Sequence, residues 1–333
     1  MWHQILLSPR GESKILRLRW RAVRVVVSLV CLIATPAWAD GHSPAFAFST
    51  AILGKGDASF ETELMWRSGT VMFGPRVSYG ISQNFQISVS SPFHINHGEH
   101  PTGRFTAMMP GNPEFEALLG WRFYHASTGI GTRNEATLYA GGSALTQHTP
   151  RVDGPALERQ PGMYVAFAAG RVARSYDIWA GAGYQRYGEW NRNNPVNSHQ
   201  SNTLLGSFAA GWRPSFLNKD YPKPDLRFFW ETTGEHVGLA WRDRTPGFGG
   251  GGGHGHLVPP TPLPSQNGII YLRNSGGKAV FSGPSFLCTY RSVAVQGGVL
   301  FAVMDQPNGR QPQYREELRV VVGVSYYFLG RRK

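Results

Sequence analysis

His199 and Ser201 are the residue pair whose types and spacing come nearest to catalytic chemistry. On an extended chain, residues i and i+2 share a face, so His199 could deprotonate Ser201 and make it a nucleophile. Such a pair needs a third group to orient the imidazole, and none is evident nearby. The surrounding segment is rich in asparagine, which is typical of a polar loop. We therefore expect no enzymatic activity and keep a hydrolase as a remote alternative.

Histidines in expected loops form a second candidate site. They fall in two groups with spacings that could bind Zn²⁺ or Cu²⁺: His94, His97 and His100, then His254 and His256. No cysteine or repeated spacing completes a coordination sphere. We expect no metal or other cofactor, and a metal-binding surface protein remains an alternative.

Charged residues that alternate with apolar ones form the third and largest set. They are Glu61, Glu63, Arg76, Glu114, Glu116, Arg122, Arg227, Glu231, Glu317 and Arg319. Mixed signs on one wall could select a solute by charge, or could form ion pairs that fill an interior. Either role requires β-strands that turn these residues to a common inner face.

The end of the chain shows the expected strand pattern most clearly. From Glu317 to Phe328, apolar residues alternate with polar or small ones, which is typical of a strand with one apolar face. The pattern recurs to give twelve strands: Ser59–Trp66, Val71–Ile81, Phe85–Ser90, Glu114–Phe123, Glu135–Ala144, Met163–Val172, Ile178–Tyr187, Thr203–Arg213, Leu226–Thr232, Lys278–Cys288, Val293–Val303 and Glu317–Phe328. Pro75 and Pro284 fall inside strands, and we expect a β-bulge at each.

Short and long connections alternate between these strands, as periplasmic turns and extracellular loops do in bacterial barrels. The longest, at about 234–277, contains a glycine run, three histidines and five prolines. This composition predicts a flexible loop that packs no core. An even number of strands with outward aromatic bands favours a closed antiparallel transmembrane β-barrel over a soluble β-sandwich.

The N-terminus predicts export. A basic segment, an apolar run from Val25 to Ala34 and an A-x-A site ending at Ala39 are typical of a secretory signal peptide of residues 1–39. Residues 40–333 then form one barrel domain. Because six basic residues and Glu12 leave with the signal, the formal charge falls from +12 to +7. The remaining basic residues are spread along the chain, which argues against nucleic-acid binding.

Several segments resemble the outer-membrane transporter family named for the meta-pathway of phenol degradation (MetA-pathway). They are 52–57, 79–85, 111–116 with 121–123, 131–135 with 137–141, 226–231, 282–285 and 322–328. The resemblance spans nearly the whole mature chain and implies a barrel that transports small organic molecules. Separately, 199–202 resembles the His-x-Ser-Asn motif of outer-membrane phospholipase, with Thr203 in place of its following glycine.

These features predict an outer-membrane channel of a Gram-negative cell for a small hydrophobic or aromatic solute. A structural or adhesive barrel is a further alternative. The expected partners are outer-membrane lipid, the barrel-assembly machinery and the solute. We expect Glu61, Glu63, Arg76, Glu317 and Arg319 to meet where the first two strands and the last one adjoin, forming one face of a narrow polar constriction.

Overall fold

The computed structural model describes residues 43–67, 70–91, 93–94, 114–145, 162–187, 198–199, 202–216, 223–238, 241–243, 269–271, 277–307 and 317–328. No helix within these ranges is long and apolar enough to cross a membrane. The expected signal peptide lies outside them.

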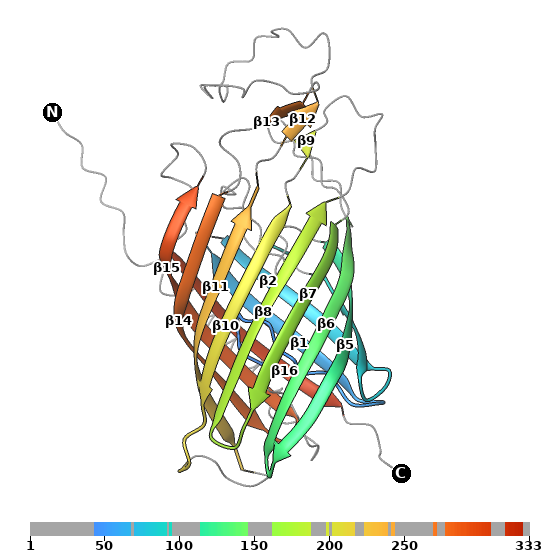
Figure 1. Ribbon diagram of the computed structural model, residues 1–333, viewed down its shortest axis with the longest axis vertical. Coiled ribbons are helices and arrows are strands. Elements are labelled where there is room, and N and C mark those ends of the chain that lie inside the picture. Colours follow the sequence, from blue (N-terminus) through green and yellow to red (C-terminus); the bar gives the residue numbers. More distant parts are fainter. Residues whose placement is uncertain are drawn as a thin grey trace, which may run out of the picture.

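Twelve antiparallel strands close into a barrel (Figure 1). They are β1 (Ala58–Arg67), β2 (Thr70–Gly80), β3 (Phe85–Ser90), β5 (Glu114–Gly129), β6 (Thr132–Leu145), β7 (Gly162–Val172), β8 (Tyr176–Tyr187), β10 (Thr203–Trp212), β11 (Asp225–Val237), β14 (Gly277–Tyr290), β15 (Val293–Pro307) and β16 (Leu318–Phe328). Each pairs with its neighbour in the chain, and β1 closes the ring by pairing with both β2 and β16. The predicted fold class is confirmed.

Alternation of side chains gives this sheet two different faces. Outward positions carry large exposed residues, among them Trp121, Trp230 and Phe328, which are 43%, 58% and 54% exposed. The residues between them, such as Arg227 and Glu231, are buried inside the barrel. Because the side-chain period of a strand is two, the sequence pattern sets which residues face inward.

The prediction of bulges at the two prolines was wrong. β2 keeps one register with β1 across Pro75, and its pairings with β3 and with β4 (Phe93–His94) share one register on either side of that residue. Likewise, β14 pairs with β15 in the same register before and after Pro284, and its register shift lies at Val280 and Phe281. The ladder is interrupted at each proline without an inserted residue.

The expected long loop also contains regular structure. β11 continues to Val237, and β12 (Trp241–Asp243) pairs with both β13 (Ile269–Tyr271) and β9 (Ser198–His199). These strands form a small sheet beyond the end of the barrel that carries the long connections (Figure 1). We call this the long-loop end, and the opposite end the short-turn end.

The stretch before β1 lies inside the barrel, which the sequence analysis did not anticipate. Phe46, Ala47 and Phe48 are each at most 5% exposed, and Thr50 is 1% exposed. We call residues 43–57 the N-terminal segment. It crosses the lumen and divides the interior between an apolar wall, against which it packs, and a polar wall.

Candidate functional site

Glu231 on β11 holds the N-terminal segment in the lumen. Its carboxylate accepts hydrogen bonds from the backbone amides of Ala45, Phe46 and Ala47 at 2.8, 2.8 and 2.7 Å. The hydroxyl of Ser285 also donates to it. A buried carboxylate needs several donors to offset its lost hydration, and the segment's unpaired backbone supplies them.

Apolar inner-face residues hold the segment from the side. Phe46 packs in a cluster with Phe281, Leu300 and Val321, and Ala47 packs in another with Trp179 and Phe229. A water-filled channel would not line its wall with such residues. The inner faces of β8, β11 and β14–β16 therefore act as the core that receives the segment.

Glycines on the strands make room for the segment. A Cβ added at Gly181 would lie 2.7 Å from the Cβ of Phe48, and one at Gly298 would lie 2.7 Å from Cε2 of Phe46. Side chains larger than hydrogen at these positions would collide with the aromatic rings. Close approach, rather than turn formation, explains these strand glycines.

Further along, the segment is fixed by side chains of β6 and β8. Thr137 donates to the carbonyl of Thr50 at 2.9 Å, and the hydroxyl of Tyr139 donates to the carbonyl of Ser49 at 2.7 Å. Trp179 Nε1 donates to the hydroxyl of Thr50, which in turn donates to Glu135 at 3.0 Å. These bonds satisfy backbone groups that have no partner in a strand ladder.

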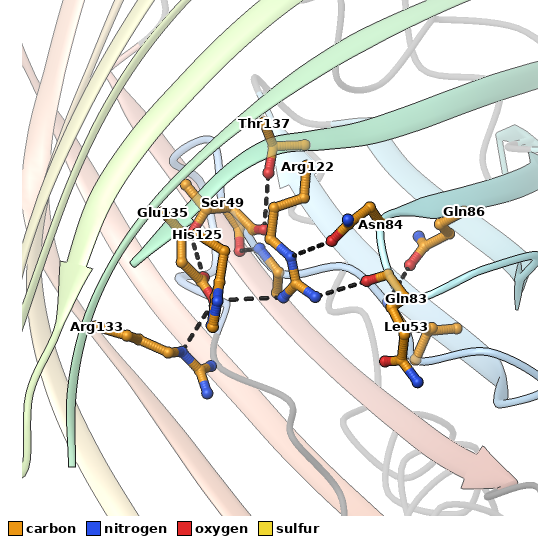
Figure 2. Close-up of polar contacts among 12 residues, drawn as sticks. Ser49, Leu53, Gln83, Asn84, Gln86, Arg122, His125, Arg133, Glu135 and Thr137 are labelled. Atoms are coloured by element: carbon orange, nitrogen blue, oxygen red, sulfur yellow. Dashed lines mark hydrogen bonds and ion pairs between the residues drawn. The ribbon is translucent and has the colours of Figure 1, made fainter. Parts of the chain in front are cut away.

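Three basic side chains surround the carboxylate of Glu135 near the short-turn end (Figure 2). Its Oε1 lies 3.3 Å from Arg122, 3.0 Å from Arg133 and 3.7 Å from His125. Arg122 also donates to the carbonyl of Gln83 in the β2–β3 turn at 2.6 Å. The guanidinium of Arg122 thus ties that turn to β6.

A cavity of about 340 Å³ remains between the N-terminal segment and the polar wall. Cross-strand pairing puts Glu61, Arg76, Ser90 and Glu116 in one row across β1, β2, β3 and β5. Arg76 lies 4.0 Å from Glu61, and their side chains are 38% and 31% exposed, so both are reachable from the cavity. Glu116 accepts a hydrogen bond from Ser90 at 2.9 Å. Glu63 lines the same cavity.

Two other arginines that the sequence analysis chose as lumen candidates form buried ion pairs. Arg319 lies 2.7 Å from Glu235, and its guanidinium sits 3.6 Å above the ring of Phe281. Arg227 lies 2.8 Å from Asp177 and 3.1 Å from Asp225.

Two of the expected lumen residues lie elsewhere or are not placed. Glu317 directly precedes β16 and is exposed, so it does not join Glu61, Glu63 and Arg76 in the expected cluster. Glu114 begins β5, but its side chain lies outside the described part of the structure.

Several functional residues were missed by sequence reasoning. Glu135, Asp177 and Glu235 provide the partners of the lumen arginines, yet they lie where alanine and glycine blur the strand phase or where a loop was expected. The N-terminal segment had one signal, namely Phe46, Phe48 and Ile52 in a stretch too short for another strand pair. The apolar inner faces of the last strands were a second signal.

The loop candidates stay untested. His97, His100, His254, His256 and Ser201 lie outside the described residues, and of His94 and His199 only the backbone is placed. Within the described ranges, no group of three or more His, Cys, Asp or Glu side chains is arranged to hold a metal ion.

The fold and the site together define a class of protein, a closed twelve-stranded antiparallel β-barrel whose lumen is occupied by its own N-terminal segment. No family model matches the chain, and no curated relative matches it.

Among solved structures, an outer-membrane channel from Pseudomonas putida F1 is similar with a TM-score of 0.52 at 9% identity, over 86% of this chain and 100% of that chain. The NanC porin matches with a TM-score of 0.42 at 8% identity, over 81% of this chain and 98% of its own. The KdgM porin matches with a TM-score of 0.38 at 9% identity, over 81% and 99%. At these identities the first likeness is one of fold alone.

Proposed function

We propose that this protein is an outer-membrane channel that passes a small solute through its lumen. The observation that carries the proposal is a closed barrel with large apolar residues exposed on its outer face and a polar cavity enclosed within it. A barrel leaves no unpaired strand edge in lipid, and the exposed aromatic and aliphatic side chains suit hydrocarbon. The shared fold of the Pseudomonas putida F1 outer-membrane channel supports this role.

The solute is a small organic molecule with an apolar or aromatic part. The cavity is lined on one side by Phe46, Phe48 and Ile52 of the N-terminal segment and by Tyr139 and Tyr164 of the barrel. A narrow space with aromatic walls favours such solutes over sugars or large ions. We also propose that the protein belongs to the phenol meta-pathway family. It would reach the membrane through a cleaved signal peptide of residues 1–39.

Liposome swelling with the purified mature protein tests the channel. We expect neutral solutes to cause swelling that falls steeply as their size increases. A variant lacking residues 43–54 should swell faster, because the lumen then loses the segment that crosses it while β1 remains intact. If neither protein causes swelling while both are folded, the channel is wrong and a structural barrel is favoured.

A further inference from the structure

The polar wall of the cavity carries more negative than positive charge. Glu61, Glu63 and Glu116 share Arg76 as the cation on this wall. The other arginines that line the cavity are already engaged, Arg122 with Glu135 at 3.3 Å and Arg319 with Glu235 at 2.7 Å. Two carboxylates are therefore left without a compensating guanidinium.

Glu63 is the least satisfied of the three acids. Glu61 accepts a hydrogen bond from Ser59 at 3.0 Å, and Glu116 accepts one from Ser90 at 2.9 Å. Among the described residues, Glu63 has no hydrogen-bond partner and no ion-pair partner within 4 Å, and it lines the cavity. A carboxylate enclosed in a barrel without a donor is stabilised by any cation that can reach it.

Spacing within the row leaves room for a ligand. Neighbouring strands lie about 4.8 Å apart, so Glu61 and Glu116, three strands apart in register, are separated by about 14 Å along the sheet. Glu63 lies roughly 7 Å further along β1 than Glu61. The three acids are therefore too far apart to coordinate one metal ion together, and a single cationic group in the cavity would meet one carboxylate at a time.

Two aromatic rings of the cavity lie on the side of Glu116. Phe48 and Tyr164 stack with centroids 6.4 Å apart and an interplanar angle of 28°, and both line the cavity. Tyr164 occupies β7, two strands beyond Glu116 in the sheet. Carboxylates beside aromatic faces form the environment that favours an alkylammonium group, because both attract its positive charge and the rings accept its apolar part.

We infer that the cavity binds a small organic ammonium ion, whose cationic group meets Glu116 and whose apolar part lies against Phe48 and Tyr164, while Glu61 and Glu63 add negative potential along the same wall. This inference rests on the proposed channel and names its substrate class. An organic anion of the same size would face the surplus carboxylates and gain Arg76 alone.

Calorimetric titration of the folded mature protein in detergent tests the inference, with phenethylammonium chloride as the probe and 3-phenylpropionate as its anionic match. We expect saturable binding of the ammonium and at least about tenfold weaker binding of the anion. The Glu61→Gln, Glu63→Gln, Glu116→Gln triple variant should bind the ammonium about tenfold more weakly. Glu317→Gln, which removes an exposed acid outside the cavity, should leave binding unchanged.

Glu116→Gln alone serves as the second variant if the triple one does not fold, and about threefold weaker binding is expected. The inference is overturned by absent saturable binding, by equal binding of the anion, or by an unchanged affinity in the variants. Displacement by KCl at the same concentration as the probe would also overturn it in favour of a site for simple cations. Liposome swelling by neutral solutes does not depend on these binding results. The proposed channel function and the proposed substrate class can therefore be contradicted independently.

Discussion

The carboxylate of Glu231 accepts hydrogen bonds from three successive backbone amides of the N-terminal segment. Glu231→Gln keeps the volume but replaces one acceptor oxygen with an NH₂ group that faces those amides. Hydrogen bonds to charged groups contribute about 1.5–3 kcal/mol, so we expect the segment to leave the lumen about ten to a hundred times more often. Liposome swelling by a neutral sugar should accelerate accordingly.

Glu317→Gln is the control for this change, since it removes a carboxylate of the same type from an exposed position. Equal swelling by Glu231→Gln and the wild type would mean that apolar packing alone retains the segment.

Arg76 and Arg319 face the same lumen, but replacing each with alanine should affect stability and solute passage differently. Arg319 forms a buried pair with Glu235 and packs over Phe281, so its loss should lower the free energy of unfolding by about 3–5 kcal/mol. Arg76 is partly exposed to the cavity and 4.0 Å from its partner, so its loss should cost about 1 kcal/mol or less. Arg76→Ala should instead change solute passage.

Urea unfolding in liposomes measures the first effect and swelling measures the second. Alanine at His254 or His256 is the comparison in the loop that the sequence predicts at about 234–277, and we expect a smaller effect on passage than at Arg76. If the histidine variants alter passage and Arg76→Ala does not, the solute site lies in the loops and the metal-binding alternative gains support.

At the scale of elements, the strands and the N-terminal segment fit each other through glycine. In Gly181→Val, the new Cβ would lie 2.7 Å from the Cβ of Phe48 and 2.8 Å from the carbonyl oxygen of Phe167 on β7, so the segment should be displaced and β8 should shift slightly against β7. Gly206→Val is the matched control, because a Cβ there meets nothing within 4 Å. Hydrogen exchange followed by mass spectrometry should show faster exchange of residues 43–57 in Gly181→Val alone. Equal exchange in both variants would contradict the close-approach argument.

At the scale of the whole molecule, the proposed membrane location makes a prediction about the outer face of the barrel. Phe208 lies in the middle of β10 and is 46% exposed, whereas Tyr176 begins β8 and is 38% exposed. Phe208→Arg should lower the free energy of unfolding in liposomes by about 2–4 kcal/mol, and Tyr176→Arg by about 1 kcal/mol or less. Equal costs at the two depths would argue against a membrane-spanning outer face.

Much of the barrel could be predicted because strand alternation is a local property. Each of the twelve strands has its own pattern, so Trp121 and Trp230 could be placed outside, and Arg76 and Glu231 inside, from the sequence. The predicted bulges at the two prolines were wrong because proline cannot donate a ladder hydrogen bond, and inside a closed sheet this is usually accommodated by a bulge. The structure instead leaves a short gap in the ladder beside Pro75 and Pro284.

The candidate site could be predicted only in part. That Glu61 would lie beside Arg76 follows from adjacent strands joined by a short turn. Pairing of Arg319 with Glu235 could not be foreseen, because two intervening strands separate β11 from β16 and the contact depends on how the barrel curves and which side chains reach across it.

The sequence by itself determined the strands, their inner and outer faces and the even count that closes the barrel, because each of these depends on a repeat of two residues within one segment. Only the tertiary structure decided what fills the lumen. The N-terminal segment has no ladder partner and no periodic pattern, and its place depends on Glu231, Thr137, Gly181 and Phe281, which come together from four strands after closure. The cavity, and the surplus of carboxylates that faces it, exist only once that segment covers the opposite wall.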